Sequence, residues 1–166
     1  MSYSNTQSVV AADLNNMVRG LNRDNSTYTV TGTTAETDMA PLSITGGTIG
    51  GTGGIHVIAT GTITNVGSGA KDIRLYLGAT AVATVSRTAA NAQDWQIDAW
   101  CFNTSSSAQR WKVVYSSADA LTLSCDYITS AIDTASTQTL KVTGDLADAT
   151  DTITQTMFDV FQVQIS

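Results

Sequence analysis

Residues 55–77 read IHVIATGTITNVGSGAKDIRLYL, and this stretch decides the fold class. Its apolar residues alternate with polar ones on both sides of a small-residue turn at 66–70. One face of the first half carries Ile55, Val57, Ala59, Gly61 and Ile63, and the second half resumes with Ile73, Leu75 and Leu77. A period of two over so many residues is typical of strands with one face on a core and the other in water. The stretch therefore predicts two strands joined as a hairpin.

The same alternation recurs from residue 28 to the end of the sequence, in short segments separated by turn residues. We expect about eight or nine strands at spacings near ten residues, which is the pattern of a sandwich or barrel. Strands so close together leave no room for helical crossovers. The sequence predicts an all-β, jelly-roll-like antiparallel β-sandwich that forms a single domain over residues 28–166. Pro41, the only proline, belongs at a sheet edge or a bulge.

Residues 1–27 are predicted to form an N-terminal arm with a short amphipathic helix over residues 8–21. Apolar residues recur there at three-to-four spacing, and they are Val10, Leu14, Met17, Val18 and Leu21. A helix this short is marginal alone, so it docks either on its own sheet or on a larger assembly. Because a polar stretch follows it at 22–26, we regard these five residues as a candidate interface.

The last strand is predicted over residues 153–165. Its odd-numbered face is apolar, and Phe158 and Val160 make the even-numbered face apolar as well. Apolar residues on both faces indicate a central strand or one at a subunit interface. We therefore add Phe158 and Val160 to the candidate interface residues.

The charge balance bears on possible partners. The 166 residues carry a net charge of −6, with only eight Lys and Arg, and charged residues make up 13%. Nucleic-acid binding needs a clustered basic stripe, and none is visible, so neither nucleic acid nor anionic membrane is an expected partner. No apolar run approaches the ~18 residues of a membrane span, and no signal peptide opens the sequence, so we expect synthesis in the cytoplasm. A charge-poor surface suits contact with other subunits.

Catalytic constellations are sparse. His56 is the only histidine, so a Ser/His/Asp triad would have to use it, and no Gly-x-Ser-x-Gly elbow is present. Glu36 is the only glutamate, and Asp94 with Asp98 is the remaining candidate carboxylate pair for a hydrolase. We expect a protein that is not an enzyme.

Three other features could bind a ligand. The glycine run at 46–54 lacks the lysine and the helix of a phosphate loop. Asp145, Asp148 and Asp151 could hold calcium, but they lack the calcium-loop pattern and fit a solvated turn better. The sequence predicts no metal and no cofactor.

The tryptophans and cysteines have two interpretations each. Trp95 and Trp111 fall on core-facing positions, whereas Trp100 is ambiguous and could belong to a sugar-binding platform. Cys101 and Cys125 lie in apolar alternation and read as buried thiols, with a disulfide between neighbouring strands as the alternative.

Part of the chain resembles a known family. The segments that carry the resemblance are TGTTAETDMA at 31–40, LSI at 42–44, GGI at 53–55, ATGTITN at 59–65 and AKDIRLYLG at 70–78. They resemble a pattern of tailed-bacteriophage virion proteins, in which Gly-Thr-x-x-Glu-Thr-x-Leu leads into a strand. A loop of small residues follows, then Gly-Thr-x-Thr-Asn and Lys-x-Ile-Arg-Leu-x-x-Gly. Met39 replaces the usual leucine, and the loop here is unusually rich in glycine.

The resemblance implies a β-sandwich protein of the virion surface, often a homotrimer. The expected function is that of a capsid decoration or cement protein, made in the host cytoplasm, which binds the major capsid protein or other virion proteins and stabilises the shell. A small head-fibre, tail-fibre or spike protein that binds a host receptor or glycan is the alternative. The chain shows no internal repeat of the kind that a long fibre shaft needs.

Overall fold

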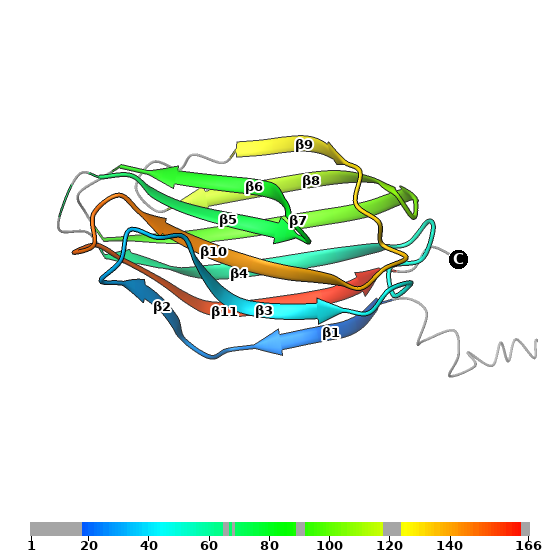
Figure 1. The fold of residues 1–166 in the computed structure, drawn as a ribbon, viewed down its shortest axis with the longest axis horizontal. Coiled ribbons are helices and arrows are strands. Elements are labelled where there is room, and N and C mark those ends of the chain that lie inside the picture. The colour runs from blue at the N-terminus through cyan, green and yellow to red at the C-terminus, as the bar shows by residue number, and fades with distance from the viewer. Residues whose placement is uncertain (1–17, 65–66, 68, 89–91, 118–123, 164–166) are drawn as a thin grey trace, which may run out of the picture.

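The computed structural model describes residues 18–64, 67, 69–88, 92–117 and 124–163. These residues form eleven strands (Figure 1), which are β1 Val18–Asp24, β2 Tyr28–Thr31, β3 Thr37–Ile44, β4 Gly54–Thr64, β5 Lys71–Leu77, β6 Thr80–Arg87, β7 Gln93–Ser105, β8 Ala108–Ser117, β9 Ser124–Ser130, β10 Gln138–Leu146 and β11 Thr152–Val163. They contain no helix, which confirms the all-β prediction for this part of the chain.

The strands make two antiparallel sheets that pack face to face. The larger sheet has the order β1-β11-β4-β7-β8-β9, and β2 pairs with the other end of β11. The smaller sheet has the order β3-β10-β5-β6. In Figure 1 the smaller sheet lies in front of the larger one, and β1 and β2 follow each other along one edge. The β-sandwich prediction is confirmed.

The chain crosses from one sheet to the other four times in this part of the fold, from β2 to β3, β4 to β5, β6 to β7 and β10 to β11. In the larger sheet β11 lies between β2 and β4, with β7 beyond β4. In the smaller sheet β10 lies between β3 and β5, with β6 beyond β5. The resulting orders β2-β11-β4-β7 and β3-β10-β5-β6 are those of a jelly roll. Strand β1 adds to one edge of this arrangement, and the β8–β9 hairpin lengthens the larger sheet.

The crossing corrects the expected hairpin at residues 55–77. Both strands exist, as β4 and β5, but β4 pairs with β11 and β7 while β5 pairs with β10 and β6. The alternation is the same in both cases, because each strand buries one face against the opposite sheet. Alternation in the sequence shows which face of a strand is buried, but it does not show which strands pair with that strand.

The inward faces of the two sheets form one hydrophobic core. Its largest fully buried side chains include Trp95, Trp111, Phe158 and Met39. Trp95 and Trp111 are therefore core residues, as their positions in the alternation predicted. Pro41 lies on β3, an edge strand, where a bulge interrupts pairing with β10 and Ala40 has a φ of 41°. This placement confirms the expected edge or bulge.

The end of the predicted helix is wrong. Residues 18–21 belong to β1, which pairs with β11 and has a bulge between Gly20 and Asn22. Leu21 lies at the bulge and packs against the core. Residues 8–17, with Val10, Leu14 and Met17, lie outside the described residues.

A second bulge explains the two apolar faces of the last strand. Between Gln155 and Met157 the pairing of β11 with β4 shifts register, so the buried positions change from odd to even. Phe158 and Val160 are consequently fully buried inside the single chain. Both side chains lack the exposed surface that the predicted subunit interface requires, and we assign them to the core.

Candidate functional site: the outer face of the larger sheet

Aromatic side chains gather on the outer face of the larger sheet, on three adjacent strands. Strand register places Phe161 of β11 opposite His56 of β4, and His56 opposite Trp100 of β7. Phe102 follows Trp100 two residues along β7, on the same face. We call these four residues the aromatic row, and each is partly exposed.

The rings of the aromatic row stack on one another. The His56 and Trp100 centroids lie 3.9 Å apart with planes inclined by 12°, and Trp100 and Phe102 are 6.2 Å apart at 14°. Phe161 lies 6.1 Å from His56 at a tilt of 32°. Because neighbouring rings cover part of each other's faces, the row offers ring edges as well as faces to a partner.

A carboxylate fixes His56 in this arrangement. Its Nε2 atom lies 3.0 Å from Oδ1 of Asp98, which precedes Trp100 by two positions on β7. Pairing of β4 with β7 brings His56 and Asp98 together, although they are far apart in the sequence. No hydroxyl group of the described residues hydrogen-bonds to His56, so the triad considered above is not assembled around it.

A second carboxylate on this face is nearly buried. Asp159 of β11 is 7% exposed, and its Oδ2 lies 3.8 Å from Nε of Arg23 on β1. Its Oδ1 atom has no hydrogen-bond donor among the described residues. A buried carboxylate oxygen without a hydrogen-bond donor lowers the stability of the folded chain. A donor from a partner molecule would therefore be stabilising here.

Basic and aromatic side chains continue the face beyond β7. Lys112 of β8 lies opposite Trp100, and Tyr127 of β9 lies opposite Lys112. Tyr127 is 80% exposed and is the one large hydrophobic residue so exposed in the described part of the chain. Exposed aromatic residues are typical of protein interfaces.

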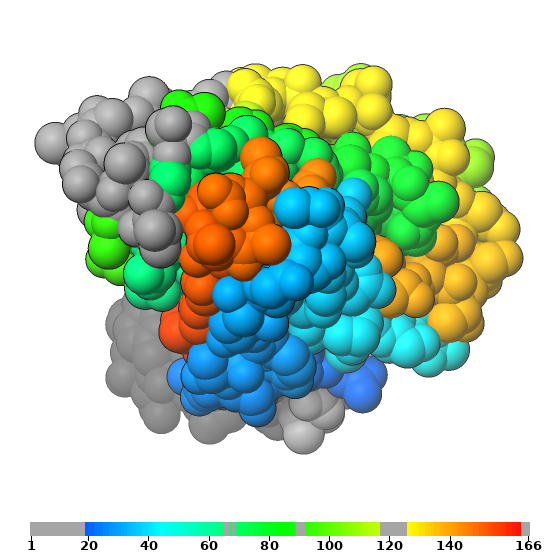
Figure 2. Space-filling model, turned by 60° about the vertical axis from the view of Figure 1, so that its left-hand side comes forward, coloured from blue at the N-terminus to red at the C-terminus, as the bar shows by residue number. Residues whose placement is uncertain are grey.

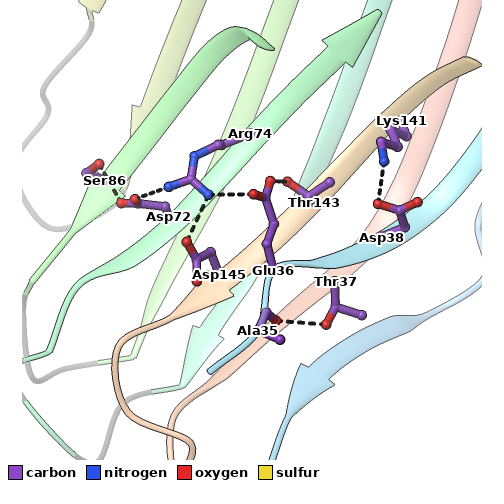
Figure 3. Close-up of polar contacts among 10 residues, drawn as sticks. All are labelled: Ala35, Glu36, Thr37, Asp38, Asp72, Arg74, Ser86, Lys141, Thr143 and Asp145. Atoms are coloured by element: carbon purple, nitrogen blue, oxygen red, sulfur yellow. Dashed lines mark hydrogen bonds and ion pairs between the residues drawn. The ribbon is translucent and has the colours of Figure 1, made fainter. Parts of the chain in front are cut away.

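The outer face of the smaller sheet is different, because its polar groups are paired with one another (Figure 3). Arg74 of β5 contacts carboxylates from three segments: Asp72 at 2.6 Å, Asp145 at 2.9 Å and Glu36 at 3.2 Å. Lys141 of β10 adds a 2.7 Å ion pair with Asp38 of β3. A surface whose charged groups already pair with one another is a poorer candidate for binding.

The electrostatics of Glu36 follow from this cluster. Partial burial opposes ionisation, but hydrogen bonds from Thr143 and Tyr76 and the charge of Arg74 outweigh it. The pKa of Glu36 is therefore lowered below its ordinary value. The same carboxylate accepts a 2.5 Å hydrogen bond from the Thr143 hydroxyl.

The acidic turn considered for calcium separates in the structure. Asp145 pairs with Arg74, Asp151 pairs with Lys71, and Asp148 accepts hydrogen bonds from Thr150. The described residues contain no group of three or more potential metal ligands. They also contain no helix that is long and apolar enough to cross a membrane.

The remaining candidate residues from the sequence are either too far apart to act together or buried in the core. Asp94 and Asp98 point the same way on β7 but are four residues apart, roughly 13 Å along a strand. Glycoside hydrolysis uses carboxyl groups about 5–9.5 Å apart. Cys101 is a free, buried thiol, and burial raises its pKa to about 12.

Leu21, another of the predicted interface residues, lies on β1, the edge strand next to β11, and packs against the core. It lines a partly open cavity of ≈ 170 Å³ between β1 and β3. The cavity is also lined by Arg19, Leu42, Ser43, Ile44, Thr45 and Thr48. The sequence did not predict the aromatic row, although Gly20, next to Leu21, pairs with Phe161 of that row. The signal for that row was the outward phase of Trp100 and Phe102 on a strand whose odd positions are buried.

Comparisons with known proteins give the following. No family model matches the sequence, and no curated protein matches it. The solved structure of lectin UEA-II in complex with galactose aligns with a TM-score of 0.47 and 10% identity, covering 89% of this chain and 92% of that one. The CBM2 module of the evolved Dit of Lactobacillus casei BL23 phage J-1 aligns at 0.40 and 7%, covering 76% and 69%.

A structure of the Gx strain of infectious bursal disease virus also aligns, at a TM-score of 0.30 and 11% identity, covering 89% of this chain and 41% of that one. All three TM-scores lie below 0.5, so these similarities carry no functional conclusion.

Proposed function

We propose that the chain is a structural component of a bacteriophage virion, and specifically a decoration protein that binds the outer capsid surface as a homotrimer. The observation that carries the proposal is the role of the residues behind the resemblance at 31–78. Glu36 and Arg74 meet at 3.2 Å, and Lys71 meets Asp151 at 3.1 Å. Because these motif residues hold distant segments of the sandwich together, the resemblance supports a shared construction with virion proteins.

The aromatic row and Tyr127 form the contact surface in this proposal. Centres of protein interfaces are enriched in aromatic residues, and the outer face of the larger sheet carries the aromatic row and Tyr127. The smaller sheet, with its internally paired charges, faces away from the capsid. Val10, Leu14 and Met17 remain candidate anchor residues.

The mechanism is mechanical. A protein that binds closed capsids, and binds separated subunits less well, raises the free energy of opening the shell by mass action. Homotrimer formation adds to this effect, because three linked contacts hold more tightly than one. Neither step needs a cofactor.

A binding experiment tests the proposal. Capsids of the phage that encodes the chain are prepared without it, mixed with purified protein, sedimented, and heated to follow genome release. Wild-type protein cosediments and raises the release temperature. We expect Tyr127→Asp to lower occupancy at least tenfold, because it replaces the most exposed aromatic side chain of the contact surface with a charge.

Thr139→Asp is the matched control. Thr139 is exposed on β10, on the outer face of the smaller sheet, so the same added charge leaves occupancy unchanged. Wild-type protein that fails to cosediment, or two variants that lose binding equally, would contradict the proposal.

A second candidate function is that of a fibre or spike protein that binds a glycan. Trp95 and Trp111 donate their indole N–H groups to Thr154 and Ser130, whereas the Trp100 indole has no acceptor among the described residues. A partly exposed donor beside the Asp98 carboxylate can hydrogen-bond to sugar hydroxyls. Glycan-array binding that Trp100→Ala abolishes would favour this candidate over decoration.

A further inference from the structure

One ion pair lies entirely inside the sandwich. Lys71 opens β5 in the smaller sheet, and Asp151 immediately precedes β11 in the larger sheet. Lys71 Nζ lies 3.1 Å from Asp151 Oδ2, and both side chains are 0% exposed. In every other ion pair among the described residues both side chains are at least partly exposed.

Backbone groups of Gly67 hold the two side chains in position. Lys71 Nζ donates to the Gly67 carbonyl at 2.7 Å, and the Gly67 N–H donates to Asp151 Oδ1 at 3.1 Å. The amine nitrogen is thereby held against the carboxyl group, and a backbone donor points at the oxygen on which negative charge would develop if the carboxyl carbon were attacked. This is the geometry of an oxyanion donor.

The turns around the pair are fixed to one another. Ala147 donates its N–H to Ala70 at 2.8 Å, and Gly32 donates to Ala149 at 2.9 Å. The Thr31 hydroxyl donates to the Asp151 carbonyl at 3.2 Å. Figure 2 shows this end of the molecule, where the turn between β10 and β11 lies against the segment after β2. Turns held in this way keep the amine and the carboxyl group in contact, which lowers the entropic cost of a reaction between them.

The exposed carboxylate of Asp148 lies on the solvent side of the pair. Its charge interacts with those of both Lys71 and Asp151. Its Oδ2 atom is 3.3 Å from where a Cβ on Gly67 would stand. This position suits a proton relay between the buried groups and water.

We propose that Lys71 and Asp151 condense to form an isopeptide bond. The Lys71 ammonium passes a proton to the Asp151 carboxylate, and the neutral Nζ attacks Cγ, which forms the C–N bond. The resulting oxyanion accepts the Gly67 N–H. The Cγ–O bond then breaks, and the hydroxyl group leaves with the second proton of Nζ as water. The step involves no oxidation and no co-reactant.

The physical reason for the step is the environment of the pair. Two charges excluded from water are held at a desolvation cost that their mutual attraction does not reliably offset. An amide has no net charge, and its N–H and C=O retain the partners that Gly67 supplies. The product would join the first residue of β5 to the segment before β11, and so link the two sheets covalently.

Intact mass spectrometry of the denatured, purified protein tests the proposal. The wild-type chain, whose sequence mass is 17.4 kDa, is expected about 18 Da lighter than its sequence, the mass of one water. Digestion should yield a branched peptide that joins the segments around residues 71 and 151. Wild-type protein at its full sequence mass would overturn the proposal, whatever its particle binding.

Two variants make the result specific. Lys71→Met lacks the nucleophile and should have its full sequence mass, and a deficit that persists in it would overturn the assignment. Asp151→Asn should lose ammonia in place of water, a deficit of about 17 Da, because the amide carbon is the same electrophile with a different leaving group. Since the wild-type mass alone decides the outcome, a variant that fails to fold leaves the test intact.

Discussion

Single residues set the closest approaches in this sandwich, and Gly61 is the clearest case. A Cβ at Gly61 would lie 1.8 Å from the Thr154 carbonyl oxygen and 2.7 Å from Cζ2 of Trp95. The tryptophan ring therefore fills the space that a side chain on β4 would take. The sequence showed a glycine on the core-facing side of an alternating strand, but not what occupies its place.

We predict that Gly61→Ala lowers the free energy of unfolding by about 2–3 kcal/mol, because the backbone of β11 or the Trp95 ring must move. Urea denaturation followed by tryptophan fluorescence measures the change. Gly51→Ala is the control, since nothing lies within 4 Å of its Cβ position. Equal loss in both variants would show that glycine flexibility, not close packing, is responsible.

A second residue-scale prediction concerns pH. The pKa of Glu36 in the folded state lies below its ordinary value of 4.5, so the folded protein favours the ionised carboxylate. Its contribution to stability is therefore present above about pH 4.5 and is lost as the pH falls through the folded pKa. We expect Glu36→Gln to be less stable than wild type at pH 7 and to lose less stability between pH 5 and pH 3.

Thermal unfolding at a series of pH values measures this difference. Asp94→Asn, at an exposed position on the other sheet, serves as the control for removal of a carboxylate. Parallel pH profiles for wild type and Glu36→Gln would contradict the role assigned to the Arg74 cluster.

At the scale of elements, bulges decide which side chains are buried. In β11 the inward positions are Ile153 and Gln155 before the bulge and Phe158 and Val160 after it. A strict period of two placed the last two on a separate face and suggested a second interface. The sequence contains no local signal for the bulge, because its position is set by pairing with β4, far away in the chain.

We predict that Phe158→Ala destabilises each chain by about 3–5 kcal/mol, the usual cost of a cavity left by a buried aromatic ring. Light scattering should give wild type and variant the same mass, which for the proposed homotrimer is 3 × 17.4 = 52.2 kDa. Phe161→Ala, on the outer face of the same strand, should cost each chain less stability and weaken capsid binding more. A dissociated but fully stable Phe158→Ala protein would place this residue at a subunit contact after all.

The same limit applies to the other elements. Alternation predicted β4, β5 and β7 because each has one buried face, and it correctly assigned Trp95 and Trp111 to the core. It did not predict that residues 66–70 carry the chain between sheets, because turn composition does not report the partner of the next strand. It did not find the aromatic row, which exists only because three strands place their rings side by side.

At the scale of the whole molecule, the two outer faces have different characters. The smaller sheet carries charged groups that pair with one another around Arg74, while the larger sheet carries stacked rings, an unsatisfied Asp159 oxygen and the exposed Tyr127. Overall composition indicated a charge-poor surface but not its division between two faces. The resemblance at 31–78 was informative about construction, since its charged residues join segments that are far apart in sequence.

The position of β10 and β11 has a consequence for the order of events during synthesis. These strands are among the last that a ribosome makes, yet each lies between earlier strands in its sheet: β10 between β3 and β5, and β11 between β4 and the β1–β2 edge. Until they emerge, β3 has no strand neighbour, and β4 and β5 each lack one, so neither sheet can be completed. The nascent chain must therefore keep its apolar faces from aggregating until translation has passed β11.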